Sequence, residues 1–365
     1  MATSAPAVAV YVNRQQMDPL RLSQVRSIEL ETGVHEQAAF KMKISIGQED
    51  SGDWASYAEK EFTPLMPVTV DARLGSTSVR LINGLLTQVK MNFTTDPCAS
   101  EIELTALDAL EKLKRLSPPR GFQNQPLSSL VQQMFTDASI TPPSTSEIPQ
   151  VGTSNPNREV IMQSHDDLTF VRALGDAVNA EVYVEPSGFD SQGHFATLDL
   201  GNALPVGTTL VVNQGKFTNV QNAQFYYDLT GPTAVEAAFV GADGKAGAPV
   251  RKTLSEIVGG HDKKLLGPPG FENVRRLERH GHERSDALQR LCLAELDRLS
   301  WIVIGKGELD TATFGDILRP RRSVRVSGAS GAFNGTYLVW KVTHSITRDR
   351  YCQKFELRRK LGVGS

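Results

Sequence analysis

Cysteine is scarce in this chain of 365 residues, which has three. Cys98, Cys292 and Cys352 are far apart and show no paired spacing, so neither a disulfide framework nor a zinc motif is indicated. Such usage is typical of free thiols in a reducing compartment. The sequence therefore predicts a protein that is made in a cytoplasm.

The chain also lacks an excess of charge and any long apolar segment. Its 39 Lys and Arg residues and 41 Asp and Glu residues give a formal net charge of −2. No global field therefore favours nucleic acid or an anionic membrane surface as a partner. No stretch approaches the length of a membrane span, and the N-terminus has no basic segment typical of a secretion signal.

Sequence signatures of catalysis are missing as well. There is no Gly-x-Ser-x-Gly nucleophile motif and no Walker-type phosphate loop. Ser164, His165 and Asp166 carry the side chains of a triad, but adjacent residues cannot converge as a triad must. Helix capping by Ser164 explains this segment better. These absences favour a structural role and predict no cofactor.

One segment is a candidate for metal binding, namely His280-Gly281-His282-Glu283. Two histidines two residues apart can share one face of a strand, and the glutamate adds an oxygen ligand. No second group of ligands stands at a recognisable spacing. The favoured alternative is a polar loop before a helix, so His280 and His282 are kept only as metal-ligand candidates.

A pattern of elements occurs twice in the chain. Each copy has a strand after a proline, an Asn-Gly turn that opens a long strand, and a return strand. The spacing from this Gly to the Leu of the return strand is 20 residues in one copy and 22 in the other. The shared order predicts an internal duplication, although β-rich chains can match by chance. The copies comprise Pro64 to Val70, Asn83-Gly84 and Ile102-Glu103-Leu104, and Pro320 to Val326, Asn334-Gly335 and Phe355-Glu356-Leu357.

Hydrophobic periodicity divides the chain into four units. Period-two alternation predicts strands in the first 115 residues, and Pro118 with Pro119 marks a boundary. Helical spacing then alternates with short strands, and the clearest helix runs over 285–299. The predicted units are a β unit at 1–117, an α+β unit at 118–203, a second β unit at 204–245 plus 305–365, and a helix-bearing insertion at 246–304.

Segments throughout most of the chain share their pattern with one known family. The matching stretches are Ile82 to Thr87, Val160 to Ser164, Asp167 to Val171, Leu318 to Pro320, Val324 to Val326, Phe333 to Tyr337, Val339, Val342 to Ile346 and Tyr351 to Leu357. They resemble the late-control D proteins of phages, which are the baseplate hub proteins of contractile tails and related injection systems. The C-terminal match is the most specific.

The resemblance implies an α+β, mainly β fold with two related β-barrel-like tube domains. It implies a homotrimer, in which two tube domains per chain give six similar units, so the ring can stack on a six-fold tail-tube protein ring. The opposite face keeps three-fold symmetry for the spike. Since the sequence ends at Ser365, we expect a separate spike protein, and other baseplate proteins as further partners. Assembly is expected in a bacterial cytoplasm, as part of a phage tail baseplate or injection-system particle.

Arginines near predicted strand ends are the candidates for contacts in the ring or its lumen. They are Arg319, Arg321, Arg322, Arg348 and Arg350. The alternative is that such basic residues are solvated strand ends. Two other functions stay open: a tail-associated cell-wall hydrolase, which needs paired carboxylates or a metal, and a carbohydrate-binding β protein.

Overall fold

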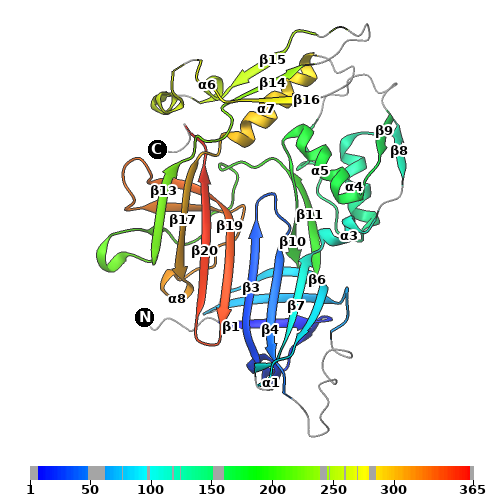
Figure 1. Ribbon diagram of the computed structural model, residues 1–365, viewed down its shortest axis with the longest axis vertical. Coiled ribbons are helices and arrows are strands. Elements are labelled where there is room, and N and C mark those ends of the chain that lie inside the picture. Colours follow the sequence, from blue (N-terminus) through cyan, green and yellow to red (C-terminus); the bar gives the residue numbers. More distant parts are fainter. Residues whose placement is uncertain are drawn as a thin grey trace.

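A computed structural model shows a mainly β protein with one large sheet and several helices (Figure 1). The large sheet has 13 strands among the described residues and is almost entirely antiparallel. This confirms the fold class predicted from the sequence. The structure describes residues 7–47, 62–75, 77–96, 99–116, 119–123, 125–150, 160–238, 245, 247–258, 260–268, 270–278 and 285–361.

The first β unit is an antiparallel sheet that curves around an apolar core. In β4 every second side chain is buried, because successive residues of a strand point to opposite faces. Phe40, Met42, Ile82 and Leu104 lie in this core. The elements are β1 (Ala7–Val12), β2 (Gln15–Gln16), α1 (Pro19–Ser23), β3 (Val25–Gly33), β4 (Ala39–Ser45), β5 (Pro67–Leu74), β6 (Thr77–Asn92) and β7 (Glu101–Asp108).

The α+β unit packs three helices against short strands. Asp166 caps α5, because its Oδ1 accepts a hydrogen bond of 2.9 Å from the backbone amide of Thr169. The expected cap, Ser164, is therefore wrong by two residues. Helix α3 packs into the core of this unit although it precedes residue 117. The elements are α3 (Leu110–Lys114), β8 (Arg120–Gln123), α4 (Leu127–Asp137), β9 (Val160–Gln163), α5 (Asp167–Val178), β10 (Glu181–Ser187) and β11 (Asp190–Ala196).

The second β unit has its own core, which includes Val324, Tyr337, Val342 and Leu357. Its longest strand, β19, lies between β18 and β20. The elements are β12 (Leu210–Val211), the 3-10 helix η2 (Gly215–Phe217), β13 (Asn222–Tyr227), β17 (Val303–Asp310), α8 (Thr311–Phe314), β18 (Ser323–Ser327), β19 (Gly335–Thr347) and β20 (Tyr351–Arg359).

The insertion is a separate three-stranded sheet covered by a helix. Strand β14 pairs with β15 and β16 here, although residues 204–245 were assigned to the second β unit. The alternation of apolar and polar residues in β14 does not reveal which sheet the strand joins. The strand belongs to the insertion because Val235 packs with Leu288 and Cys292 of α7. The elements are β14 (Ala234–Ala238), β15 (Val250–Thr253), α6 (Leu254–Ile257), the 3-10 helix η3 (Gly260–Leu266), β16 (Val274–Glu278) and α7 (Ser285–Leu299).

The two β units repeat one strand order. The path β5-β6-β7-β4-β3 of the first unit recurs as β18-β19-β20-β17-β13, and every neighbouring pair is antiparallel. Ranked along the chain, both paths read third, fourth, fifth, second, first. Each long strand also has an irregularity against its return strand, at Thr87 and at Trp340.

The first Asn-Gly pair is not a turn. Asn83 lies inside β6, where its side-chain oxygen accepts a hydrogen bond of 2.8 Å from Thr69 Oγ1 and its Nδ2 donates 3.0 Å to the carbonyl of Gly188. Only the second pair fits the prediction, because β19 begins at Gly335. The turn assignment of the first pair is therefore wrong, because Asn83 lies within a strand and its side chain forms a hydrogen bond to the β10–β11 hairpin.

A joint between β19 and β3 makes the two β units one continuous wall (Figure 1). The strands pair antiparallel from Lys341 opposite Gly33 to Thr347 opposite Ser27. Leu30 and Val342 are fully buried at this joint. Along the wall the order is β13-β17-β20-β19-β3-β4-β7-β6.

We expect Leu30→Ala to lower the free energy of unfolding by about 2–5 kcal/mol, because it leaves a cavity where the two β units meet. The matched control is Glu29→Ala on the exposed face of the same strand, which should change it by about 0.5 kcal/mol or less. Urea unfolding of both variants measures the difference. Equal losses would show that the joint is not tightly packed.

Candidate functional site

Three of the four units meet around one small cavity of about 80 Å³. Its lining comes from the β3–β4 region, from β6, from the β10–β11 hairpin and from the segment before β18. Arg321 is one of the lining residues and has a φ of 63°, in the left-handed region that bulky residues rarely adopt. Such a backbone is maintained only when its surroundings determine it.

The Arg321 side chain bonds to two other units. Its Nε donates 2.9 Å to Glu181 Oε2, and its Nη2 donates to Glu181 Oε1 and 2.8 Å to the carbonyl of Gly33. The guanidinium also lies 4.0 Å from the ring centroid of Tyr183. The Arg321 and Glu181 side chains are 11% and 1% exposed, so this ion pair is within the fold.

At the junction of the three units, around Arg321, the buried guanidinium is paired with the Glu181 carboxylate. Burial alone would lower the pKa of Arg321, but the Glu181 carboxylate outweighs burial and the pKa lies above its ordinary value. Burial raises the pKa of Asp108, on the cavity lining, to about 6, even though the backbone amides of Ala38 and Leu110 donate to its carboxylate. The junction is therefore a structural clamp.

Two of the five candidate arginines form ion pairs within the chain. Arg321 is buried against Glu181, and Arg322 pairs with Glu185 at 2.9 Å. Their expected contacts with other subunits stay a prediction. Sequence spacing does not reveal a partner some 140 residues away. Both arginines hold the second β unit to the β10–β11 hairpin.

The other three arginines are exposed. Arg348 Nη2 donates 2.6 Å to the carbonyl of Ser23, and Arg350 Nη2 donates 2.8 Å to Gln221 Oε1. Arg319 lines the same cavity as Arg321. Their role in contacts between subunits stays a prediction.

The metal candidates His280 and His282 lie outside the described residues. Within the part of the chain that the structure describes, no group of three or more His, Cys, Asp and Glu side chains is arranged to hold a metal ion. In the same part, no helix combines the length and the apolar character needed to cross a bilayer.

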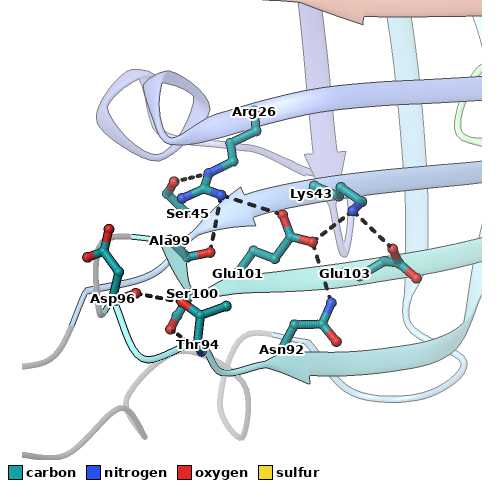
Figure 2. A network of polar contacts seen from close by, with 10 residues as sticks. All are labelled: Arg26, Lys43, Ser45, Asn92, Thr94, Asp96, Ala99, Ser100, Glu101 and Glu103. Carbon is teal, nitrogen blue, oxygen red and sulfur yellow. Dashed lines mark hydrogen bonds and ion pairs between the residues drawn. The ribbon is translucent and has the colours of Figure 1, made fainter.

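The exposed face of the wall carries paired charges that the sequence reading overlooked (Figure 2). Lys43 Nζ lies 2.8 Å from Glu101 Oε1 and 3.7 Å from Glu103 Oε2. Arg26 Nη1 lies 3.7 Å from Glu101 Oε2, and Asn92 Nδ2 donates 3.4 Å to Glu101 Oε1. The hydrogen bond with Lys43 lowers the pKa of Glu101.

The same arrangement continues into the second unit. Lys341 Nζ lies 2.8 Å from Glu31 Oε1 across the joint, and Lys306 Nζ lies 3.1 Å from Glu356 Oε2. The other face of these strands packs onto the two cores. The signal was present in the sequence, because Lys and Glu recur at every second position of neighbouring strands.

Comparison with known proteins relates this fold to tail proteins. No protein-family model and no curated protein match the sequence. A 43 kDa tail protein of prophage MuSo2 from Shewanella oneidensis has a similar structure, with a TM-score of 0.69 and 12% identity over 99% of this chain and 100% of that chain. A tail protein from Neisseria meningitidis has a TM-score of 0.67 and 11% identity over 98% and 97%.

A component of the Escherichia coli type VI secretion system is also similar, with a TM-score of 0.59 and 15% identity over 98% of this chain and 78% of that chain. That protein is described as structurally similar to tail proteins of bacteriophage T4. The fold is thus one found in phage tails and in a secretion system, and the resemblance drawn from the sequence is confirmed at this level.

We expect Glu181→Gln to lower the free energy of unfolding by about 3–5 kcal/mol, because it leaves the Arg321 charge buried without its counter-ion. Glu185→Gln, at the more exposed Arg322 pair, is the matched control and should cost about 1 kcal/mol or less. Urea unfolding at pH 7 compares the two. Similar losses would refute the clamp.

A second prediction concerns acid stability. Burial lowers the pKa of His344, on β19, to about 3, so the unfolded chain takes up a proton between pH 6.5 and 3 that the folded chain does not. Stability from this group is full above pH 6.5 and is lost as the pH falls, by up to about 1.4 kcal/mol per unit.

We expect His344→Gln, which keeps an acceptor for the Tyr351 hydroxyl, to reduce this dependence. Asp108 acts in the opposite sense, because a carboxyl with a raised pKa loses stability as the pH rises from about 4 to about 6. Urea unfolding of the unmodified chain and of the His344→Gln variant at pH 4.5 and at pH 7 therefore gives the difference in unfolding free energy between the two proteins at each pH. The same difference at both pH values would contradict the assignment of this pH dependence to His344.

Proposed function

We propose that this chain is a structural hub protein of a phage tail baseplate or of a contractile injection system. Three copies form a ring with six similar β units. One face of the ring stacks on a six-fold tail tube, and the other carries a three-fold spike. The ring thus adapts one symmetry to the other.

The observation that carries the proposal is the repeated strand order. Two β units with the same five-strand path and the same polarity stand side by side in one chain, linked by β19 and β3. A trimer of such chains presents six near-equivalent units, which a chain with a single β unit cannot do. The solved tail proteins of similar fold support the same role.

In this proposal the tube domains are residues 1–117 and residues 204–245 with 305–365. Helix α3 and strand β14 are left out of them, because both pack elsewhere. The α+β unit at 118–203 and the insertion at 246–304 are peripheral domains. They are candidates for contact with other baseplate proteins.

The exposed face of the wall suits a channel. It presents Lys–Glu pairs such as Lys43 with Glu101 and Lys306 with Glu356, and its apolar residues point to the opposite face. Paired charges give a hydrated surface without a strong field of one sign. Proteins that pass through such a channel would meet little apolar surface on which to bind.

The implied partners are a tail-tube protein ring, a separate spike protein and other baseplate proteins, assembled in a bacterial cytoplasm. The similar type VI secretion component, which is described as structurally similar to tail proteins of bacteriophage T4, supports a place in a tail-like assembly. We propose a structural role rather than catalysis, since the similar proteins are tail components.

We expect a native mass of about three times the 39.9 kDa of one chain, measured by light scattering or native mass spectrometry. Particle images should show a three-fold ring with a six-lobed face. A chain that stays monomeric at high concentration and with tube protein present would contradict the hub. Turnover of peptidoglycan that a chelator abolishes, or glycan binding by the monomer, would favour the alternatives.

A further inference from the structure

The wall ends on two strand edges that have no strand partner among the described residues. At one end, β13 pairs with β17 on one side only. At the other, residues 88–92 of β6 pair with β7 on one side, whereas β5 covers the opposite edge only up to Leu85. Open edges of this kind are templates for another strand.

The repeat of strand order gives each open edge a counterpart inside the chain. Both long strands skip one residue against the return strand, so Gln88 opposite Thr105 corresponds to Lys341 opposite Glu356. Residues 88–92 of β6 thus correspond to residues 341–345 of β19, which pair with β3.

The open edge of β13 can be matched with a strand inside the chain in the same way. Lys41 pairs with Thr105 and Lys306 pairs with Glu356, so these two lysines correspond. Their next partners are Glu29 on β3 and Gln224 on β13. Residues 224–228 therefore correspond to residues 29–33, the part of β3 that pairs with β19.

We propose that neighbouring chains join by repeating the β19–β3 joint, with the edge of β13 in one chain pairing antiparallel with residues 88–92 of β6 in a second copy. The register places Gln88 opposite Asp228, Lys90 opposite Tyr226 and Asn92 opposite Gln224. This proposal rests on the proposed ring and deepens it, because it specifies the surface and the register.

Backbone directions agree with this pairing. The amide of Asp228 donates 2.9 Å to the carbonyl of Ile302, so alternation turns the amides of Phe225 and Tyr227 to the outer edge. Inside the chain, the amide of Val34 donates 2.8 Å to the carbonyl of Trp340. By alternation the amides of residues 30 and 32, the counterparts of 225 and 227, also face the joint.

Burial of the side chains points the same way. Val89 and Met91 on β6, and Phe225 and Tyr227 on β13, are only partly buried at the margins of their cores. Their counterparts at the existing joint include Val342, His344 and Leu30, which are 0%, 1% and 0% exposed. A strand from a second copy would bury the four half-covered apolar side chains in the same way.

The geometry also accounts for a closed assembly. Strands β13 and β6 lie at opposite ends of the wall (Figure 1), so the contact is head to tail. Head-to-tail contacts form rings when the rotation at each contact closes. Three joints within chains and three between chains then alternate around a trimer, and every wall edge is paired.

The test is a disulfide across the proposed joint, in the chain carrying Lys90→Cys and Tyr226→Cys. Directly opposed residues without mutual hydrogen bonds lie about 4.5 Å apart between Cα atoms, within disulfide range. Mild oxidation should give covalent dimers and trimers that reductant reverses. Glu31→Cys with Thr343→Cys, the corresponding pair inside the chain, should give a link without a change in mass.

Two further variants control for register and background. Lys90→Cys with Asn222→Cys is displaced by four residues and should not link. Each single-cysteine chain reports any reaction with the native thiols, of which Cys292 and Cys352 are buried. A native trimer that links at 31 and 343 but not at 90 and 226 overturns this joint and leaves the ring intact. A chain that is monomeric throughout overturns the proposed function as well.

Hydrogen exchange supplies a readout that does not depend on cysteine geometry. If the joint forms, the amides of Phe225 and Tyr227 should exchange at least about tenfold more slowly in the assembly than in the chain diluted to a monomer. Leu30 and Val342, at the joint inside the chain, should be protected in both. Unchanged exchange at 225 and 227 in a native trimer would overturn the proposal even if neither cysteine pair linked.

Discussion

The pairing of β19 with β3 is the constraint on which the rest of this architecture depends. Each β unit has a wall of four strands with one apolar and one polar face, and without the joint each wall would end on an additional open edge. Backbone groups at such an edge must find partners in water or in another strand. Because the joint supplies these hydrogen-bond partners within the chain, the two β units form one continuous sheet with an apolar and a polar face.

The clamp around Arg321 explains how that surface stays oriented. Two packed β units could slide or hinge at a joint of one strand pair, but Arg321 binds Glu181 and the carbonyl of Gly33 together. A buried ion pair contributes little net stability, since desolvation offsets the attraction. It does penalise arrangements that separate the charges. The hairpin β10–β11 is thereby held at a defined place against both units.

Much of the fold follows from the sequence because the relevant signals are local. Alternation in residues 39–45 and 101–108 predicted strands with one buried face, and the structure has them. The repeat predicted two related β units, and the strand orders agree. Errors occurred where a local signal competed with a distant contact: Asn83 has the chemistry of a turn residue, yet it bridges β6 to Gly188. The candidate site shows the same limit, because Arg321 and Arg322 were predicted to be ring contacts or solvated strand ends, and their acidic partners are remote in sequence.

By itself the sequence determined the strands, their buried faces and the existence of a repeat, since side-chain alternation and spacing act over a few residues. Only the tertiary structure decided which edges meet. Residues 27–33 and 341–347 pair across more than 300 positions, and any β strand offers the same backbone groups to a partner. The choice among possible partners was made by the packing of Leu30 and Val342 and by the charge of Arg321 against Glu181, which exist only once the units have come together.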